Sequence, residues 1–404
     1  MKIGVLTQFF DPEPVPIPGM FARYLVSAGH NVRVLCGWPN YPNGKIYDGY
    51  RHLCNTRAIE HGVHVLRVPL WPHHSTSPAG RIANYLSFAI SSTTHFRFLR
   101  DADVIYVYAT PPTASLCAEI LRGQVPYVLH VQDLWPESIL GSSMLSATTT
   151  RLADALLRPW LYGLHHHAAA LVAIAPSMAA ELLNRGATAE QIHMIMNPGT
   201  RSRAQAFVRL TPEESRPDHR TFRLLYAGNI GIMQDLETVM EALALVGDLL
   251  YVHLDVVGDG VATASVRNTA QRLGLETVTF HGRLPRDRLD WFYAHCDFQI
   301  ITLRDLPVFR LTIPSKFQEG LALGLPVITT VRGDLADLVR AHGVGLCASS
   351  HSPEDLARAI RCAYDLSDSS RQGMSDRALA LYDRTMTPTV AFSRMRRILL
   401  ELPS

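Results

Sequence analysis

The residues whose types and spacing could do chemistry stand closest together at Ser315, Lys316 and Glu319. Lys316 is one of only three lysines among 38 Lys and Arg residues, the others being Lys2 and Lys45. Lys316 and Glu319 would share one face of a helix, for which Ser315 is the predicted N-cap. A helix start with a lysine suits a phosphate, and a carboxylate one turn on can accept hydrogen bonds from ligand hydroxyls. The alternative is a helix that binds nothing.

A second group of such residues begins at the end of the predicted strand Tyr127–Val131 and continues beyond it. His130, Asp133 and Glu137 bring imidazole and carboxylate groups to the carboxyl end of that strand. Groups of this kind at a strand end are more often functional than structural. They are therefore candidates for binding and for proton transfer. For His130 taken alone, a packed core histidine is an equal alternative.

Five further candidates for ligand contacts lie in predicted loops. They are Gly19 after the first strand, Asn229 and Gln234 after the strand Phe222–Ala227, and Arg283 and Leu284 after the strand Val278–Phe280. A glycine lets a backbone approach a ligand closely, and neutral amides can hydrogen-bond a phosphate. An ordinary loop or turn is the alternative for Gly19 and for residues 280–284.

Strands and helices that alternate along the chain must position these groups. The predicted strands of the first half are Ile3–Gln8, Val32–Cys36, Val63–Val68, Asp103–Tyr108, Tyr127–Val131 and Leu171–Ala175, and those of the second are Phe222–Ala227, Val252–Val257, Val278–Phe280, Phe298–Thr302 and Pro326–Thr330. This alternation predicts an α/β fold of doubly wound parallel sheets. The 404 residues suit two domains, placed at 1–200 and 201–384, with a linker at 197–221.

Composition narrows the class of protein. A net charge of +2 gives no reason to expect nucleic acid as a partner. Six scattered cysteines without a Cys-x-x-Cys pair fit a reducing cytosol, and no apolar run is long enough to span a membrane. No metal site is expected, because the chain lacks clustered histidine and cysteine ligands and His165 to His167 cannot share one helix face.

Three segments carry a resemblance to a known family. Residues 314–327 contain Glu319-Gly-Leu-Ala-Leu-Gly-Leu-Pro-Val, which resembles the donor-site pattern of family 4 glycosyltransferases. Residues 130–138 and 226–236 resemble segments of the subgroup that builds colanic acid and O-antigen repeat units. The resemblance implies a GT-B fold, with two Rossmann-like domains facing each other across a cleft and C-terminal helices at about 385–404 packing back on the first domain.

The resemblance also implies roles for the candidate residues. The activity would be retaining transfer of a hexosyl or N-acetylhexosaminyl group from a nucleotide diphosphate, with UDP expected, to a hydroxyl. The first domain would take the acceptor and the second the donor. Glu319 would hold the ribose, Lys316 would stabilise the departing diphosphate, and Asp133 would accept a proton beside His130. Donor contacts would come from Gly19, Asn229, Gln234, Arg283, Leu284, Arg310 and Ser315 as well.

The chain departs from the family at three positions. Leu311 stands where a first glutamate is usual, and Asn229 and Gln234 stand where an arginine and a lysine usually hold the diphosphate. Lys316, Arg310 and Arg304 are the expected replacements. These departures keep two other functions open, a UDP-sugar 2-epimerase of the same fold and a non-catalytic GT-B scaffold.

The expected partners follow from the same resemblance. They are a nucleotide sugar, which serves as co-substrate with no other cofactor, and a glycan or lipid-linked acceptor. The expected location is the cytoplasm or the inner face of a membrane. The segment 79–100 joins apolar residues to basic ends, for which core packing is the main account and a peripheral membrane contact the second.

Overall fold

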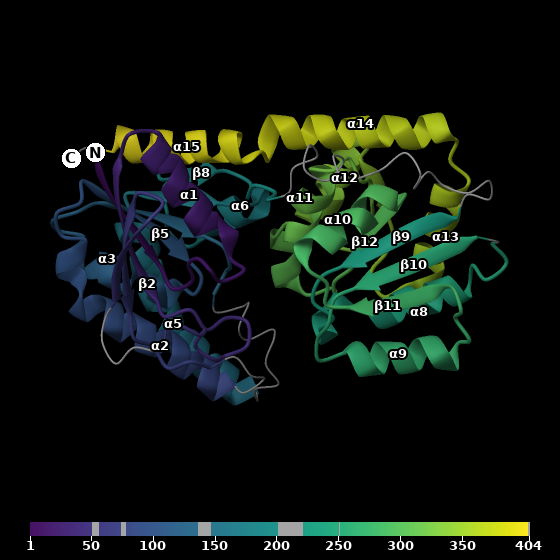
Figure 1. Ribbon diagram of the computed structural model, residues 1–404, viewed down its shortest axis with the longest axis horizontal. Coiled ribbons are helices and arrows are strands. Elements are labelled where there is room, and N and C mark those ends of the chain that lie inside the picture. Colours follow the sequence, from purple (N-terminus) through teal and green to yellow (C-terminus); the bar gives the residue numbers. More distant parts are fainter. Residues whose placement is uncertain (51–55, 74–77, 136–146, 201–220, 250, 403–404) are drawn as a thin grey trace. The chain divides into compact units, whose positions relative to one another are not determined.

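The structure is a computed structural model that describes residues 1–50, 56–73, 78–135, 147–200, 221–249 and 251–402. The chain forms two compact units (Figure 1). One consists of Met1–Met196 together with Pro388–Ser404, and the other of Asn197–Thr387. Most of the predicted linker 197–221 lies outside the described residues, as does Glu137. Each unit is an α/β structure around one sheet.

The first unit contains an eight-stranded sheet in the order β3-β4-β2-β1-β5-β6-β7-β8. Its strands are β1 (Lys2–Thr7), β2 (Asn31–Gly37), β3 (Thr56–Glu60), β4 (Val63–Val68), β5 (Val104–Ala109), β6 (Tyr127–Val131), β7 (Ala170–Ala173) and β8 (Ile192–Met194). All neighbouring strands are parallel except β3, which pairs antiparallel with β4 at the edge. The order reverses direction at β1, which is the switch point typical of a doubly wound sheet.

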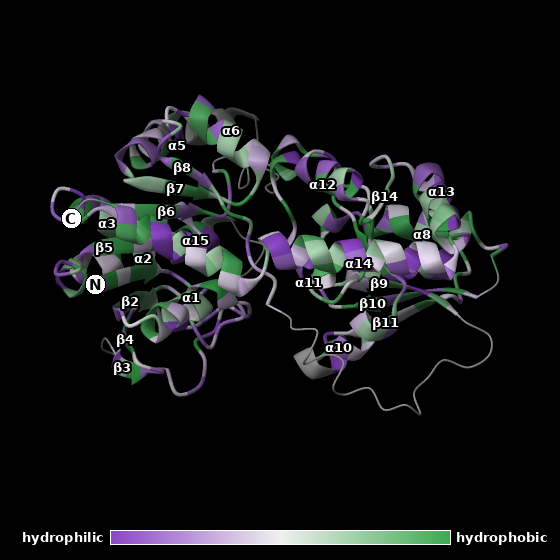
Figure 2. Cartoon of the chain, turned by 90° about the horizontal axis from the view of Figure 1, so that it is seen from above, coloured by the Kyte–Doolittle hydropathy of each residue, from purple (hydrophilic) through white to green (hydrophobic). Residues whose placement is uncertain are grey.

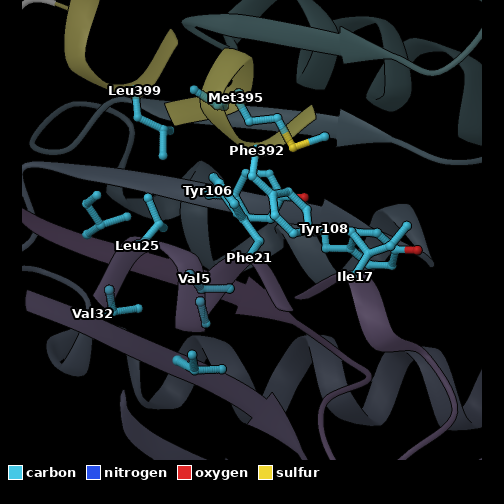
Figure 3. Close-up of a cluster of buried hydrophobic side chains, with 14 of the residues drawn as sticks. Val5, Ile17, Phe21, Leu25, Val32, Tyr106, Tyr108, Phe392, Met395 and Leu399 are labelled. Carbon is cyan, nitrogen blue, oxygen red and sulfur yellow. The ribbon is translucent and has the colours of Figure 1, made fainter. Parts of the chain in front are cut away.

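Helices join the strands of this sheet and end the chain against it. They are α1 (Pro16–Ser27), α2 (Pro78–Thr94), α3 (Leu116–Leu121), α5 (Ala147–His167), α6 (Pro176–Asn184) and α15 (Pro388–Glu401), with 3-10 turns η1 (Phe96–Phe98) and η2 (Pro112–Ser115). Figure 3 shows Phe392 and Met395 of α15 beside Phe21 of α1 and Tyr106 of β5, in one buried cluster. The last helix therefore completes the core of the first unit.

The second unit repeats this architecture with six strands in the order β11-β10-β9-β12-β13-β14. The strands are β9 (Phe222–Ala227), β10 (Val252–Val257), β11 (Val278–Gly282), β12 (Phe298–Ile301), β13 (Val327–Thr329) and β14 (Gly345–Cys347), all paired in parallel. The helices are α8 (Leu236–Ala244), α9 (Thr263–Arg272), α10 (Arg286–His295), α11 (Ser315–Leu321), α12 (Asp334–His342), α13 (Pro353–Tyr364) and α14 (Asp368–Thr385), with η4 (Ile232–Gln234) and η5 (Pro307–Leu311).

The expected α/β fold is confirmed in both units. In Figure 2 the helices α14 and α15 alternate between hydrophilic and hydrophobic colours, as helices with one buried face do. Every residue of β5 and β6 is buried, because helices cover a parallel sheet on both sides. The carboxyl ends of the strands in each sheet then lead into the loops that carry most of the candidate residues.

Candidate functional site

The helix α11 in the second unit has its N-cap one residue earlier than predicted. Pro314 occupies the N-cap position and makes no side-chain cap, while Ser315 is the first helical residue and is exposed. The prediction of Ser315 as N-cap is therefore wrong, because the extended backbone of Pro314 already ends the preceding loop. The helix has only seven residues, so its dipole adds little to the charge of a lysine.

Lys316 lies against a buried aromatic ring and a glycine. Its Nζ is 3.8 Å from the centre of the Tyr226 ring, a cation–π distance, and Tyr226 itself is fully buried. A Cβ added at Gly228 would lie 2.5 Å from Cε of Lys316, and Gly228 has φ 141°. Burial lowers the pKa of Lys316 to about 7. The lysine thus lies beside the loop after β9 with its charged form disfavoured, and a bound negative charge there would stabilise that form.

Glu319 is already engaged by the protein. Its Oε1 accepts hydrogen bonds from the backbone N–H of Thr200, at 2.8 Å, and from the Thr200 hydroxyl, at 2.5 Å. Thr200 in turn follows Gly199, whose N–H donates to the carbonyl of Met386 and whose carbonyl accepts from the Tyr382 hydroxyl. A ribose role for Glu319 stays a prediction, in which the ribose hydroxyls take the place of Thr200.

The loop from Gly228 to Asp235 is tightly held. The side chain of Gln234 accepts a hydrogen bond from the N–H of Gly231 at 3.0 Å, and the Gln234 carbonyl accepts one from Thr302 at 2.5 Å. Asn229 is exposed, and its carbonyl accepts from the Tyr226 hydroxyl at 2.5 Å. Asn229 is therefore accessible, whereas Gln234 is turned back on its own loop, and the donor contacts of both stay predictions.

The two arginines expected to replace the missing cations differ in their environments. Arg310 forms two hydrogen bonds with Asp305, at 2.7 and 2.8 Å, and Asp305 also lies 3.1 Å from Arg332. Arg304 is half-buried and makes no ion pair with any residue that the structure describes. Its backbone N–H donates to the carbonyl of Met233. Its guanidinium Nε is buried without a hydrogen-bond partner. Arg304 is thus the arginine of the two whose charge no described carboxylate compensates, and the donor contact of each stays a prediction.

The segment after β11 lies at the same sheet edge as Gly228. Gly282 accepts a hydrogen bond from the N–H of Gly258 at 2.8 Å. A backbone hydrogen bond from Gly260 lowers the pKa of the Asp259 carboxyl group, and the charge of the exposed Arg283 lowers it further. Leu284 packs on a small hydrophobic cluster. Backbone contact with a ligand at this turn stays a prediction.

In the first unit, His130 is fully buried. It lies within β6, and its Nδ1 is 2.5 Å from the Tyr106 hydroxyl, while the Tyr108 ring meets it edge-on at 5.6 Å. These surroundings favour the alternative of a packed core histidine over direct contact with a substrate. Its role near a sugar stays a prediction.

Asp133 lies just beyond the end of β6 and is half-buried. Burial raises the pKa of its carboxyl group above the ordinary value. Burial also raises the pKa of the Tyr85 hydroxyl. The charge of Arg81 lowers this pKa and the charge of Asp133 raises it, so both charged groups act on that phenol. A carboxyl group with a raised pKa is suited to accepting a proton near neutral pH.

A cavity of about 250 Å³ opens at the carboxyl edge of the first sheet. Residues from five separate segments line it: Phe9, Val15, Asn40, Tyr41, His73, Arg81, Asn84, Tyr85, Tyr108 and Thr110. Sequence reasoning missed this set, since its members lie up to a hundred positions apart and form no motif. The one available signal was that Phe9, Asn40 and Tyr41 lie soon after predicted strands, and it does not extend to the lining residues of α2.

Glu13 fixes two of the loops around that cavity. Its carboxylate accepts backbone hydrogen bonds from Asn40 and Tyr41, both at 2.8 Å, and from Phe10 at 3.1 Å. Burial raises its pKa to about 7, although the backbone donors and Arg67 oppose this shift. Glu13 therefore holds the loop after β1 against the loop after β2, beside the cavity.

Gly19 lies inside α1 rather than in the loop before it. It is buried, and the Asp11 carboxylate occupies the space where a Cβ would be, while also pairing with Arg23. The predicted loop position is therefore wrong, since α1 begins at Pro16, an accepted residue for a first helical turn. Its donor contact stays a prediction.

Within the described ranges, no three His, Cys, Asp or Glu side chains gather as a metal site. The triplet Asp101-Ala102-Asp103 lies at the amino end of β5, where Asp103 accepts from the Lys2 backbone N–H at 2.8 Å.

Among described helices none is both long and apolar enough to cross a membrane. On α2, Ile82, Leu86 and Ile90 are exposed, so core packing does not account for that face.

The sequence matches two described domain families. Residues 17–198 match the Glycosyl transferase 4-like domain, and residues 209–379 match Glycosyl transferases group 1. The chain is 27% identical to the protein of Escherichia coli (strain K12) named as colanic acid biosynthesis glycosyl transferase WcaI, over 90% of this chain and 92% of that one. It is 26% identical to the protein named as glycosyltransferase WbjE of Pseudomonas aeruginosa, over 66% and 68% of the two chains.

A solved structure supports the fold. The Anabaena protein HepE, crystallised in complex with UDP and glucose, is similar over 100% of both chains, with a TM-score of 0.70 and 18% identity. At that identity the likeness concerns the fold alone, which is the GT-B type that the resemblance implied.

Proposed function

We propose, from the premise that this chain belongs to the glycosyltransferases of the 4-like and group 1 families, that it is a retaining enzyme using a UDP-sugar. The second unit would bind the donor and the first unit the acceptor. The acceptor would be a hydroxyl of a polysaccharide or glycoconjugate precursor, a proposal supported by the relative named for colanic acid biosynthesis. UDP as the carrier is supported by the complex of the similar HepE structure.

The observation that carries the proposal is the position of Lys316. Its amino group lies beside Gly228, just after the end of β9, where the missing Cβ leaves room for the lysine side chain. A diphosphate in this loop would receive a full positive charge from Lys316 and hydrogen bonds from exposed Asn229. Negative charge develops on the departing diphosphate during transfer, so a cation here acts where the reaction needs it.

The reaction breaks the bond between the sugar's anomeric carbon and the diphosphate oxygen. It forms a bond from the same carbon to the acceptor oxygen, and the leaving diphosphate keeps the electron pair. The acceptor hydroxyl loses one proton, which passes to Asp133 or to the diphosphate itself. The raised pKa of Asp133 supports the first path.

The decisive experiment offers the protein a panel of UDP-, GDP- and dTDP-sugars and follows the products by mass. The proposal expects one UDP-sugar to be consumed, with slow hydrolysis or transfer to an added glycan. An isomerised UDP-sugar formed without acceptor would instead show the epimerase. Failure to bind any nucleotide would leave the scaffold function.

Independence from divalent metals is part of the proposal. Protein cations such as Lys316 and Arg304 would take the place of a metal at the diphosphate. Activity should persist in excess chelator, measured on the UDP-sugar found in the panel. Loss of turnover in chelator, restored by manganese or magnesium, would contradict this mechanism.

A further inference from the structure

The cavity in the first unit contains a cation that the fold does not use. The Arg81 side chain lines the cavity and is half-buried, yet it makes no hydrogen bond or ion pair with any residue that the structure describes. Several arginines of this unit have carboxylate partners, among them Arg23 with Asp11, Arg67 with Glu60, Arg122 with Glu119 and Arg185 with Glu181, whereas most of the others without one are exposed. A half-buried guanidinium without an acceptor is costly, and an anion in the cavity would satisfy it.

The remaining polar groups of the cavity differ in how far the fold satisfies them. Asn84 donates to the Trp71 carbonyl at 2.6 Å and accepts from Gln8 at 2.6 Å, so its amide is occupied. The hydroxyl oxygen of Thr110 is buried and has no hydrogen-bond partner in the described part of the chain. Arg81 and Thr110 are therefore two polar groups that the protein leaves open toward this space.

The rest of the lining is aromatic. Phe9, Tyr41, Tyr85 and Tyr108 contribute rings, and such walls suit the apolar face of a sugar ring. The volume of about 250 Å³ lies below the range of roughly 300–1,000 Å³ usual for drug-sized ligands, so it suits one sugar unit. Arg81 and Asp133 both act on the pKa of the Tyr85 hydroxyl, so the two charged groups lie near the same wall of the cavity, although Asp133 does not line it.

We infer that this cavity binds the acceptor through an anionic group, a carboxylate or a phosphate ester on a sugar, held by the Arg81 guanidinium. The inference rests on the proposed function, which makes the ligand of this cavity the acceptor of the transfer, and it adds the chemical class of that acceptor. The planar guanidinium can donate two parallel hydrogen bonds to either kind of oxyanion, which a lysine or an amide cannot do. The aromatic walls would hold the ring that carries the anion.

The test is a binding titration with three small probes at low ionic strength, in which NMR monitors the protein signals. Methyl glucuronide supplies a carboxylate, glucose 6-phosphate a phosphate, and methyl glucoside neither. One anionic probe should bind at least about tenfold more tightly than the glucoside, and which one does so distinguishes a uronic acid from a phosphate ester. Arg81→Gln should abolish that preference, and Arg81→Lys should restore part of it.

Two controls separate this inference from the proposed function. Arg97→Gln removes an exposed arginine of η1, beyond the end of α2 that lies about 20 Å along the helix from Arg81, and should change nothing. UDP affinity should be the same in Arg81→Gln and the wild type, whatever the outcome for transfer. Equal binding of all three probes, no binding of either anion, or a preference that survives Arg81→Gln would overturn the inference.

Discussion

Lys316 gives the clearest prediction at the scale of a single residue. Its pKa of about 7 in the free protein means that it is largely neutral above that pH. A bound diphosphate favours the charged form, so its pKa rises and binding takes up a proton. UDP affinity should therefore fall by up to about tenfold per pH unit between roughly pH 7.5 and 9.5. Calorimetry in buffers of different ionisation enthalpy measures this uptake directly.

Lys316→Arg is the matched control for that experiment. An arginine stays charged throughout the range, so the dependence of UDP affinity on pH should disappear. Proton uptake of the same size in Lys316→Arg would assign it to another group and contradict the account of Lys316.

At this scale the sequence predicts residue types better than their partners. Lys316 stood out because lysine is rare in this chain, and the structure places it in a distinctive environment. The bond between Glu319 and Thr200 joins residues 119 positions apart, and no local pattern could indicate it. The ion pair of Arg310 with Asp305 depends on how the turn η5 folds, which propensities leave open. Partner choice depends on tertiary structure, whereas residue type does not.

At the scale of elements, Gly228 at the end of β9 is the position most sensitive to a methyl group. An alanine there would place Cβ 2.5 Å from Lys316 Cε, at a φ of 141° that only glycine adopts easily. The lysine would have to leave the Tyr226 ring. Gly228→Ala should weaken UDP binding by about tenfold or more, corresponding to roughly 1.4 kcal/mol, measured by calorimetry.

Gly274 provides the comparison for this substitution. It also has a positive φ, of 65°, but a Cβ there would meet nothing within 4 Å. Gly274→Ala should lower stability slightly and leave UDP affinity unchanged. If both variants lose affinity equally, the effect of Gly228 is one of general stability and not of Lys316.

The strands were predictable where burial leaves continuous apolar runs. The expected bounds Val63–Val68, Tyr127–Val131, Phe222–Ala227 and Val252–Val257 match the observed strands. The edge strand β3 was missed, because one face is solvated and Thr56–Glu60 contains mostly polar residues. Three-residue strands such as β8 and β14 are too short for a periodic signal.

At the scale of the whole molecule, the chain leaves the first unit at residue 196 and returns to it at 388. Phe392 of α15 is 2% exposed, and its ring lies 5.3 Å from Phe21 and 5.7 Å from Tyr24. Phe392→Ala should destabilise the first unit by about 3–5 kcal/mol. Leu400 on the same helix is 39% exposed, and Leu400→Ala should cost little. Denaturant unfolding compares the two, and an equal loss would mean that α15 does not complete this core.

The most direct test of the central claim is the rate at which UDP-sugar is consumed by the wild type, Lys316→Ala and Lys45→Ala. Lys45 is an exposed lysine of the first unit and controls for loss of charge alone. The wild type and Lys45→Ala should turn over the UDP-sugar equally, with Lys316→Ala slower by about 10²–10³-fold. Turnover by Lys316→Ala at the wild-type rate, or a wild type that consumes no nucleotide sugar, would contradict the account.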